Sequence, residues 1–255
     1  MAKSGASLYE LFWENSKLSP VTAPSFSARI ASYSASGRRP PSFRFPSPDI
    51  VLERPTDFLA SLMARRESAR AFSRTAVTER QLGRVFGAFA ASAHGSRTFP
   101  SAGATYAVEI FCLLNNVEGP LNGHAVYYNH DRHSVSVVGE VPSWEEYADT
   151  VNIETSGVPQ LVFVFVVLPE RTTQKYGERG GRFALLEVGH TAQNLALRLV
   201  AERMVGCAAG GLYDDVLLRM LGLGEVHAHV ALGYVCGLAP HERRMLGRLI
   251  RTGTS

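Results

Sequence analysis

KYGERGGRFALLEVGHTAQNLALRLVAERMVGCAAGGLYDD, at residues 175–215, contains the dominant helical pattern of the chain. A glycine-rich basic turn is expected over residues 177–182, followed by a helix from Phe183 to about Val205. At 1.5 Å per residue such a helix is about 35 Å long, enough to cross a domain. A helix that is apolar on most sides must be buried on most sides, either centrally or across a subunit interface, with its ends framing a site. Polar residues share one stripe of it: Glu187, Thr191, Asn194, Arg198 and Glu202.

Length and composition describe a globular protein of 255 residues, of which 45% are hydrophobic, with a net charge of +3. This fits one domain, or one domain with an extension. Basic residues are scattered, which argues against a dedicated nucleic-acid binder and permits a modest anion site. The N-terminus lacks a long apolar segment, and the longest apolar run, Leu161–Leu168, is too short to span a bilayer. A cytoplasmic protein is therefore expected.

Cysteine and histidine usage predicts no metal site. Cys112, Cys207 and Cys236 are odd in number and far apart in apolar runs, so they are interpreted as buried thiols. His190 stands alone among apolar residues of the long helix and is predicted to be a core histidine. The zinc-protease, dinucleotide and P-loop motifs are all missing from the sequence.

The first 50 residues are predicted to form an extended arm, and residues 51–255 the main domain. Residues 1–22 contain one amphipathic piece, LYELFWENSKL, whereas residues 23–50 are rich in Ser, Pro and Arg. The second part also carries aromatic residues, which a free coil would rarely do. We expect it to lie on a surface, such as that of a partner subunit, with little secondary structure and these anchors: Phe26, Tyr33, Phe43 and Phe45.

The remaining pattern predicts a mixed α+β domain, with a central sheet and one dominant helix. Thr78 and Gln81 form a capping box that opens a helix. Residues 92–105 read as a loop because Gly, Pro and Ser interrupt the pattern. Shorter helices are expected at residues 57–66, 144–150 and 214–221. Strands are predicted at Val108–Leu114, His124–Tyr128, Ser134–Val138, Leu161–Leu168, which suits a strand covered on both faces, and Val226–Val235.

Four short segments carry groups suited to a site, although each has an ordinary structural alternative. The guanidinium groups of residues 65–70 can grip a phosphate or simply form a solvated helix end. Residues 100–104 let the backbone approach a ligand or form a plain loop. Lys175 and Tyr176 are credible proton-transfer groups or an exposed loop. Residues 208–211 can offer backbone N–H groups to a flat heterocycle or end the helix.

Taken together and in this order, these segments resemble the nitroreductase superfamily of FMN enzymes. Within it, the pattern is most similar to the SagB-type branch, the thiazoline and oxazoline dehydrogenases of peptide natural-product assembly. The resemblance covers roughly residues 57–236, and five matches in the same order are far more specific than any one of them. The matching segments are RRESARAF, PSAGATYAVEIF, YYNHDRHSVSVV, KYGERGGRFALLEVGHTAQNL and AAGGLYDD.

The resemblance implies a fold, a cofactor and roles for individual residues. The fold would be a nitroreductase-like FMN fold, with a mixed or antiparallel sheet flanked by helices in an intertwined homodimer. The Lys175–Tyr176 pair would be catalytic, and the long helix would be part of the dimer interface. The implied FMN contacts are Arg66 and Ser68 for phosphate and ribityl, Arg70 at the flavin N1–O2 edge, Pro100, Ser101, Ala102 and Gly103 from the other protomer, and Gly210 and Gly211 near N5.

Several positions depart from the family pattern. Glu67 is inserted before Ser68, so Arg65 is an alternative phosphate ligand. Gly181 stands where an aromatic residue is common, which would open the substrate pocket. Thr105 and Ala107 replace Leu and Pro of the family loop. A second phosphate cation is expected near the C-terminus, where the candidates are Arg243 and Arg244.

The implied activity is FMN-dependent oxidation of thiazoline or oxazoline rings to thiazoles or oxazoles. The substrate would be a peptide, either free or tethered to a carrier protein or a cyclodehydratase or synthetase partner, and of ribosomal or nonribosomal origin. Two alternatives stay open. One is an NAD(P)H-dependent nitroreductase, and the other is a non-catalytic scaffold subunit of a synthetase, which would carry no stoichiometric FMN.

Overall fold

The computed structural model describes residues 7–37, 50–92 and 94–240. Their centre is a six-stranded sheet in the order β3-β2-β1-β4-β6-β5, with every neighbouring pair antiparallel. The predicted α+β fold is confirmed, and the sheet is antiparallel rather than mixed. The strands are β1 (Val108–Leu114), β2 (His124–Asn129), β3 (Ser134–Glu140), β4 (Leu161–Val167), β5 (Met204–Ala209) and β6 (His229–Leu238).

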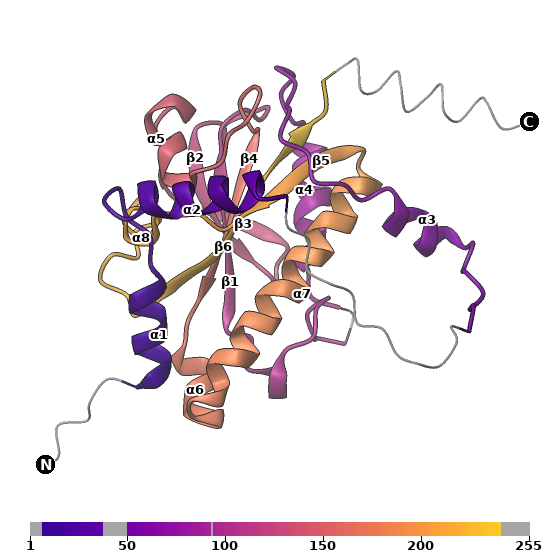
Figure 1. The fold of residues 1–255 in the computed structure, drawn as a ribbon. Coiled ribbons are helices and arrows are strands. Elements are labelled where there is room, and N and C mark those ends of the chain that lie inside the picture. Colours follow the sequence, from indigo (N-terminus) through magenta and orange to yellow (C-terminus); the bar gives the residue numbers. More distant parts are fainter. Residues whose placement is uncertain (1–6, 38–49, 93, 241–255) are drawn as a thin grey trace, which may run out of the picture.

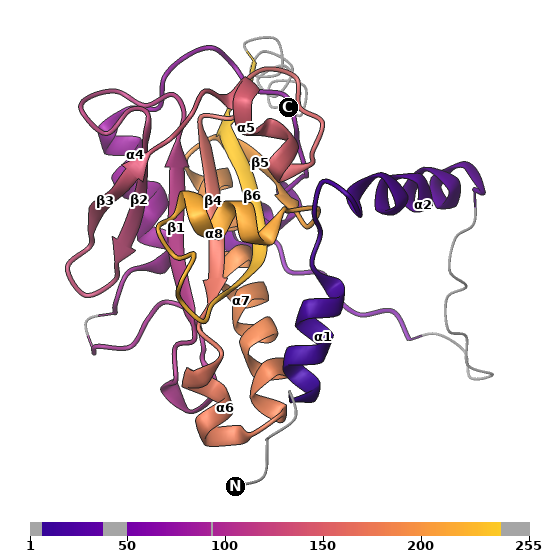
Figure 2. The ribbon, with the colours of Figure 1, turned by 90° about the vertical axis from the view of Figure 1, so that its left-hand side faces the viewer.

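Helices cover both faces of this sheet (Figures 1 and 2). The longest, α7, lies with α4 on one face, whereas α5 and α8 pack on the other. The helices are α1 (Leu8–Ser16), α2 (Ala23–Ala35), α3 (Phe58–Ala64), α4 (Glu79–Phe86), α5 (Trp144–Val151), α6 (Glu170–Tyr176), α7 (Arg179–Ala201) and α8 (Asp214–Met220), with short 3-10 turns η1 (Gly87–Phe89) and η2 (Ala102–Ala104).

Strand β4 divides the core into two halves, as its continuous apolar sequence predicts. All seven of its residues are buried. Because successive side chains of a strand point to opposite faces, Phe163 and Phe165 pack beneath α7 while Val162 and Val164 pack beneath α5 and α8. Together the two apolar layers form the hydrophobic core on the two faces of the sheet. The predicted buried thiols are also confirmed, since all three cysteines are free and buried.

The long helix begins earlier than its apolar pattern indicates. It starts at Arg179, so most of the expected glycine-rich turn is helical. Gly180 permits this, because a methyl group there would overlap the backbone of Thr172 on α6. The helix ends at Ala201, and residues 204–209, expected to finish the helix and a cap, form the edge strand β5. The sequence did not predict this strand, because Gly and Ala have a low propensity for β-strands.

The polar stripe of α7 contacts its own chain. Glu187 and Thr191 are buried, and Asn194 donates hydrogen bonds to the carbonyl oxygens of Ala88 and Thr98. In contrast, His190 is exposed within this chain, so the prediction of a core histidine is wrong. The helix therefore presents its polar stripe to the loop and helix beside it.

The N-terminal segment is more helical than predicted. Residues 23–35 form α2, where Pro24 occupies a position compatible with a helix start, so the expectation of little secondary structure fails there. Helix α1 packs on the body through buried Tyr9 and Trp13. Helix α2 instead projects away from the sheet, and only Ala23 is buried in it (Figure 2). Phe43 and Phe45 lie outside the described residues.

None of the described helices is both long enough and apolar enough to cross a membrane.

Candidate active site

The Lys175–Tyr176 pair lies in the last turn of α6, not in an irregular loop as expected. Lys175 Nζ donates a hydrogen bond to the carbonyl oxygen of Gly103, at 3.1 Å. The Tyr176 ring packs edge-on against Phe183 of α7, with centroids 5.0 Å apart. A helix end and an aromatic contact therefore hold the two side chains together.

The loop around Gly103 is shaped to meet this pair. Gly103 has a φ of +57°, a conformation that other residues adopt at a cost. A methyl group at this position would overlap both the Tyr176 hydroxyl and the Lys175 ammonium group. Both polar ends thus lie against the backbone of the loop. The structure brings together two segments that the sequence separates by 72 residues.

A buried carboxylate, Glu187 of α7, fixes the same loop. Its side chain accepts hydrogen bonds from Ser101 Oγ at 2.5 Å and from the Val108 N–H at 3.0 Å. Ser101 Oγ also accepts from the Tyr106 N–H at 2.8 Å. The Ser101 hydroxyl is therefore engaged inside its own chain. The sequence placed Glu187 on the polar stripe but gave it no partner, since the contact spans 86 residues.

The predicted phosphate segment runs beside the edge strand β5. Ser68 forms a parallel bridge with Gly206, and the Ala69 N–H donates to the Gly206 carbonyl oxygen at 3.0 Å. Arg66, Ser68 and Arg70 are exposed there. Arg66 Nη1 lies 3.5 Å from Ser68 Oγ, so the cation and the hydroxyl can bind one anion together.

The two glycines after β5 differ in their surroundings. Gly210 is exposed, and a methyl group there would meet open space. Gly211 is buried, and a methyl group there would crowd the side chain of Asn152. A flat ring could therefore approach the backbone at Gly210, while Gly211 is packed within the chain. Next to them, burial raises the pKa of Asp214 to about 6.

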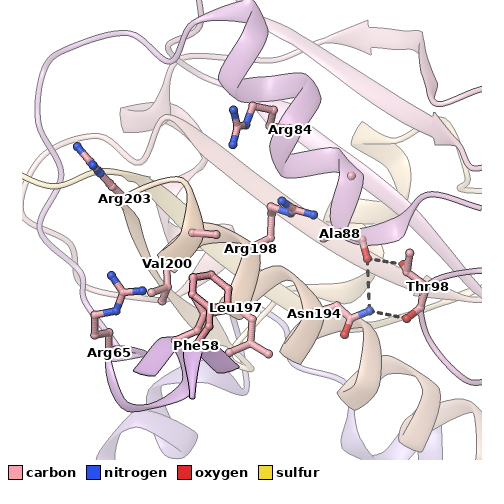
Figure 3. A pocket seen from close by; sticks show the side chains of 13 residues that line it. Phe58, Arg65, Arg84, Ala88, Thr98, Asn194, Leu197, Arg198, Val200 and Arg203 are labelled. Carbon is pink, nitrogen blue, oxygen red and sulfur yellow. Dashed lines mark hydrogen bonds between the residues drawn. The ribbon is translucent and has the colours of Figure 1, made fainter. Parts of the chain in front are cut away.

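A cavity of about 660 Å³ lies between α3, α4 and the C-terminal half of α7. Arg65 projects from α3 along its wall, and Phe58 and Leu197 lie nearby (Figure 3). Glu202 pairs with Arg84 at 2.8 Å and with Arg198 at 3.7 Å. The lining therefore carries more positive than negative charge and suits an anionic group. Its guanidinium groups come from Arg65, Arg84, Arg198 and Arg203.

The predicted site residues thus form two groups in one chain. The first, the loop–lysine group, comprises residues 100–103 with Lys175 and Tyr176 at the end of α6, just before α7. The second, the β5-edge group, comprises residues 65–70 with Gly210 and Gly211. Arg65 of this group lines a cavity with the last turns of α7, far from α6 (Figure 1). Arg243 and Arg244 lie outside the described residues.

The β5-edge group has the donors and the open backbone that could hold a flavin mononucleotide. Exposed guanidinium groups and a hydroxyl match a phosphate, and the open backbone at Gly210 matches a planar ring. The loop–lysine group adds donors of a different kind, a lysine and a tyrosine held by a tight loop. The loop–lysine group lies near the N-terminal end of α7, and Arg65 of the β5-edge group lies near its C-terminal end. A site that used both groups would therefore need residues from both ends of this helix.

Comparisons with known proteins identify the family to which this fold belongs. The model of the nitroreductase family matches residues 63–237. MJ1384 of Methanocaldococcus jannaschii, named as a nitroreductase, is 32% identical over 171 residues, which are 66% of this chain and 85% of that protein. The microcin B17-processing protein McbC of Escherichia coli is 33% identical over 134 residues, 51% of this chain and 49% of McbC.

A solved structure adds a likeness of fold. A chain of the E. coli microcin synthetase McbBCD complex with truncated pro-MccB17 bound superposes with a TM-score of 0.62 at 21% identity. The match covers 94% of the present chain and 100% of the other. At this identity the likeness concerns the architecture alone.

Proposed function

The chain belongs to the nitroreductase family, and on that premise we propose that it is an FMN-dependent dehydrogenase. Its substrates would be thiazoline or oxazoline rings in peptides, and its products thiazoles or oxazoles. The observation that carries the proposal is the Lys175–Tyr176 pair, held against Gly103 with both polar ends together. The similarity to the microcin B17-processing protein McbC supports the same chemistry.

Azoline oxidation removes a proton from the ring Cα and a hydride from the ring Cβ. When bound, FMN supplies the acceptor for the hydride. The chain itself must take the proton, which is acidic because Cα adjoins a carbonyl group. Tyr176 as a phenolate or Lys175 as a neutral amine would accept this proton, since a positioned base contributes about 10²–10⁴-fold to such a transfer. The hydrogen bond to Gly103 keeps the Lys175 amino group close to the tyrosine.

Cofactor binding is assigned to the β5-edge group. Arg66 and Ser68 would hold the phosphate and ribityl groups, and Arg70 the flavin N1–O2 edge. Arg65 is a second phosphate candidate because it lines the cationic cavity. Gly210 would lie against the ring more closely than buried Gly211. Arg243 or Arg244 would complete the phosphate contacts.

A homodimer would bring the two groups together. Residues 100–103 would reach the FMN of the second copy through their backbone, because the Ser101 hydroxyl is already engaged. Apolar side chains that the second copy would cover are exposed on α3, beside the cavity, and on the N-terminal half of α7. They are Phe58, Leu59 and Met63 around α3, and Leu185 and Leu186 on α7.

The substrate is proposed to arrive with a partner. A peptide could be free, or tethered to a carrier protein or to a cyclodehydratase or synthetase subunit. The fold likeness to a chain of the McbBCD complex, solved with a truncated pro-peptide bound, motivates this proposal. Helix α2 projects from the body and offers an exposed surface for such a partner (Figure 2).

Two substitutions test the catalytic assignment. Lys175→Ala and Tyr176→Phe should keep the bound yellow FMN and lose azole formation by at least about 100-fold. Flavin absorbance and mass analysis of the peptide product measure the two quantities separately. Retained turnover in both variants would exclude this pair from catalysis.

A nitroreductase that uses NAD(P)H is the second candidate, favoured by the similarity to MJ1384. Such an enzyme would draw its electrons from a nicotinamide rather than from the azoline ring. The source of electrons therefore separates the two candidates.

A further inference from the structure

A compact cluster of two histidines and a glutamate lies where α1 meets the start of β6. Glu10 comes from α1, His229 opens β6, and His227 directly precedes it. Glu10 Oε1 lies 3.2 Å from His227 Nε2, and Glu10 Oε2 lies 3.6 Å from His229 Nε2. One ligand atom from each of the three residues lies within 4.8 Å of the other two.

His229 is the unusual member, because it is buried without a hydrogen bond. Only 2% of its surface is exposed, and neither ring nitrogen has a hydrogen-bond partner among the described residues. Trp13 stacks on the ring at 4.6 Å, and Tyr9 packs edge-on at 5.8 Å. Burying an imidazole with two unpaired nitrogens costs free energy, so the ring calls for a ligand that the chain does not supply.

The spacing suits a small divalent metal ion. Tetrahedral zinc binds nitrogen and oxygen ligands at about 2.0–2.1 Å, which sets neighbouring ligand atoms about 3.3 Å apart. The two Glu10 contacts, at 3.2 and 3.6 Å through its two oxygens, are near this separation, and a small shift of the side chains would bring one atom of each residue onto a common ion.

The environment of His227 completes the arrangement. Its other ring nitrogen, Nδ1, lies 3.6 Å from Glu170 Oε1 at the start of α6. A carboxylate behind a metal-bound histidine fixes the ring and its tautomer. The His227 side chain is half exposed, so the fourth ligand position faces solvent and suits a water molecule.

We propose that Glu10, His227 and His229 form a zinc site that fastens α1 to the sheet. The site is independent of azoline oxidation and of the flavin. It joins α1, β6 and, through Glu170, the helix α6 that carries Lys175 and Tyr176 at its other end. The alternation His–Ala–His at residues 227–229 places both rings on one face, which is the signal in the sequence.

Titration of the full, flavin-loaded chain with Zn²⁺ tests the site. The protein is first freed of metal with a chelator, and calorimetry then measures affinity and stoichiometry. One Zn²⁺ per chain is expected to bind and to raise the midpoint of thermal unfolding in a concentration-dependent way. Titration with Co²⁺ should give the visible absorption of tetrahedral coordination by nitrogen and oxygen ligands.

His227→Ala is the decisive variant, because removal of a half-exposed side chain leaves the core packed. Affinity for Zn²⁺ should fall by more than the 10–100-fold that is typical of losing an outer-shell partner, at unchanged flavin content. His94→Ala, an exposed histidine in the loop before β1, is the matched control and should bind Zn²⁺ like the parent. Equal affinity in His227→Ala and parent, or no saturable binding in the parent, would overturn the proposal.

Discussion

The two groups of candidate site residues differ in how far the chain satisfies its own polar atoms. In the loop–lysine group, Ser101 donates to the buried Glu187 beside it, and Lys175 donates to the Gly103 carbonyl oxygen, so both polar side chains are hydrogen-bonded within the chain. In the β5-edge group, Arg66 and Ser68 are exposed, and their side chains lie 3.5 Å from each other. The first group is a preformed network and the second is a set of open donors.

This difference suggests a division of labour. Groups that must sit at a fixed place relative to reacting atoms need support from their surroundings, which the buried Glu187 provides. Groups that bind a charged ligand need free donors on an accessible surface. Substitutions should therefore affect stability in the loop–lysine group and ligand affinity in the β5-edge group.

The largest effect is expected from Glu187→Ala. The change leaves the Ser101 hydroxyl and the Val108 N–H without their acceptor in a buried site, so the free energy of unfolding should fall by about 4 kcal/mol. Urea denaturation measures it. Glu187→Gln keeps one acceptor oxygen and should lose less. A stability within 0.5 kcal/mol of the parent, a margin typical of surface changes, would show that the network does not support the fold.

Asp214 follows Gly210 and Gly211 in the chain but is buried, unlike the exposed Arg66 and Ser68. Its contribution to the free energy of unfolding depends on pH. Burial raises its pKa from 3.8 to about 6, so the folded state favours the neutral acid. The stabilisation is complete below pH 3.8 and is lost as the pH rises to about 6. Asp214→Asn should remove this loss and gain up to about 3 kcal/mol relative to the parent between pH 4 and pH 7.

Urea denaturation of the parent and Asp214→Asn at both pH values isolates this contribution. Other titrating groups act equally on both proteins and cancel in the difference. A difference in unfolding free energy that is the same at both pH values would contradict the raised pKa of Asp214.

A smaller effect, on affinity alone, is expected from Arg66→Ala. Loss of one charge-assisted contact to phosphate should weaken FMN binding by about 2 kcal/mol, or about 30-fold. The free energy of unfolding of the flavin-free protein should change by less than about 0.5 kcal/mol, because Arg66 is exposed. Fluorescence titration with FMN measures the affinity. Arg80→Ala, exposed on α4, is the control, and equal losses in both variants would place the phosphate elsewhere.

Elements with strong periodic patterns could be predicted from the sequence, and contacts between distant segments could not. The run at residues 161–168 revealed a strand covered on both faces, and the Thr78–Gln81 capping box revealed the start of α4. The edge strand β5 was missed because Gly206 and its small neighbours resemble a helix cap.

The candidate site was foreseeable as a set of motifs rather than as a geometry. Motif order identified residues 65–70 and Lys175–Tyr176, but their partners depend on how the chain folds back. The pairing of Ser101 with Glu187 is one case, and the approach of Glu10 to His229 is another. Neither contact could be predicted from a local sequence pattern, because the two partners come from separate elements.

The electron donor of the bound flavin tests the proposed function most directly. The flavin-loaded protein would be mixed anaerobically with a synthetic thiazoline peptide and, separately, with NADPH, while flavin absorbance is followed. The account predicts bleaching by the thiazoline peptide, together with loss of two hydrogens from the peptide, and no rapid bleaching by NADPH. Bleaching by NADPH with an unchanged thiazoline peptide would contradict it and identify a nitroreductase that uses nicotinamide.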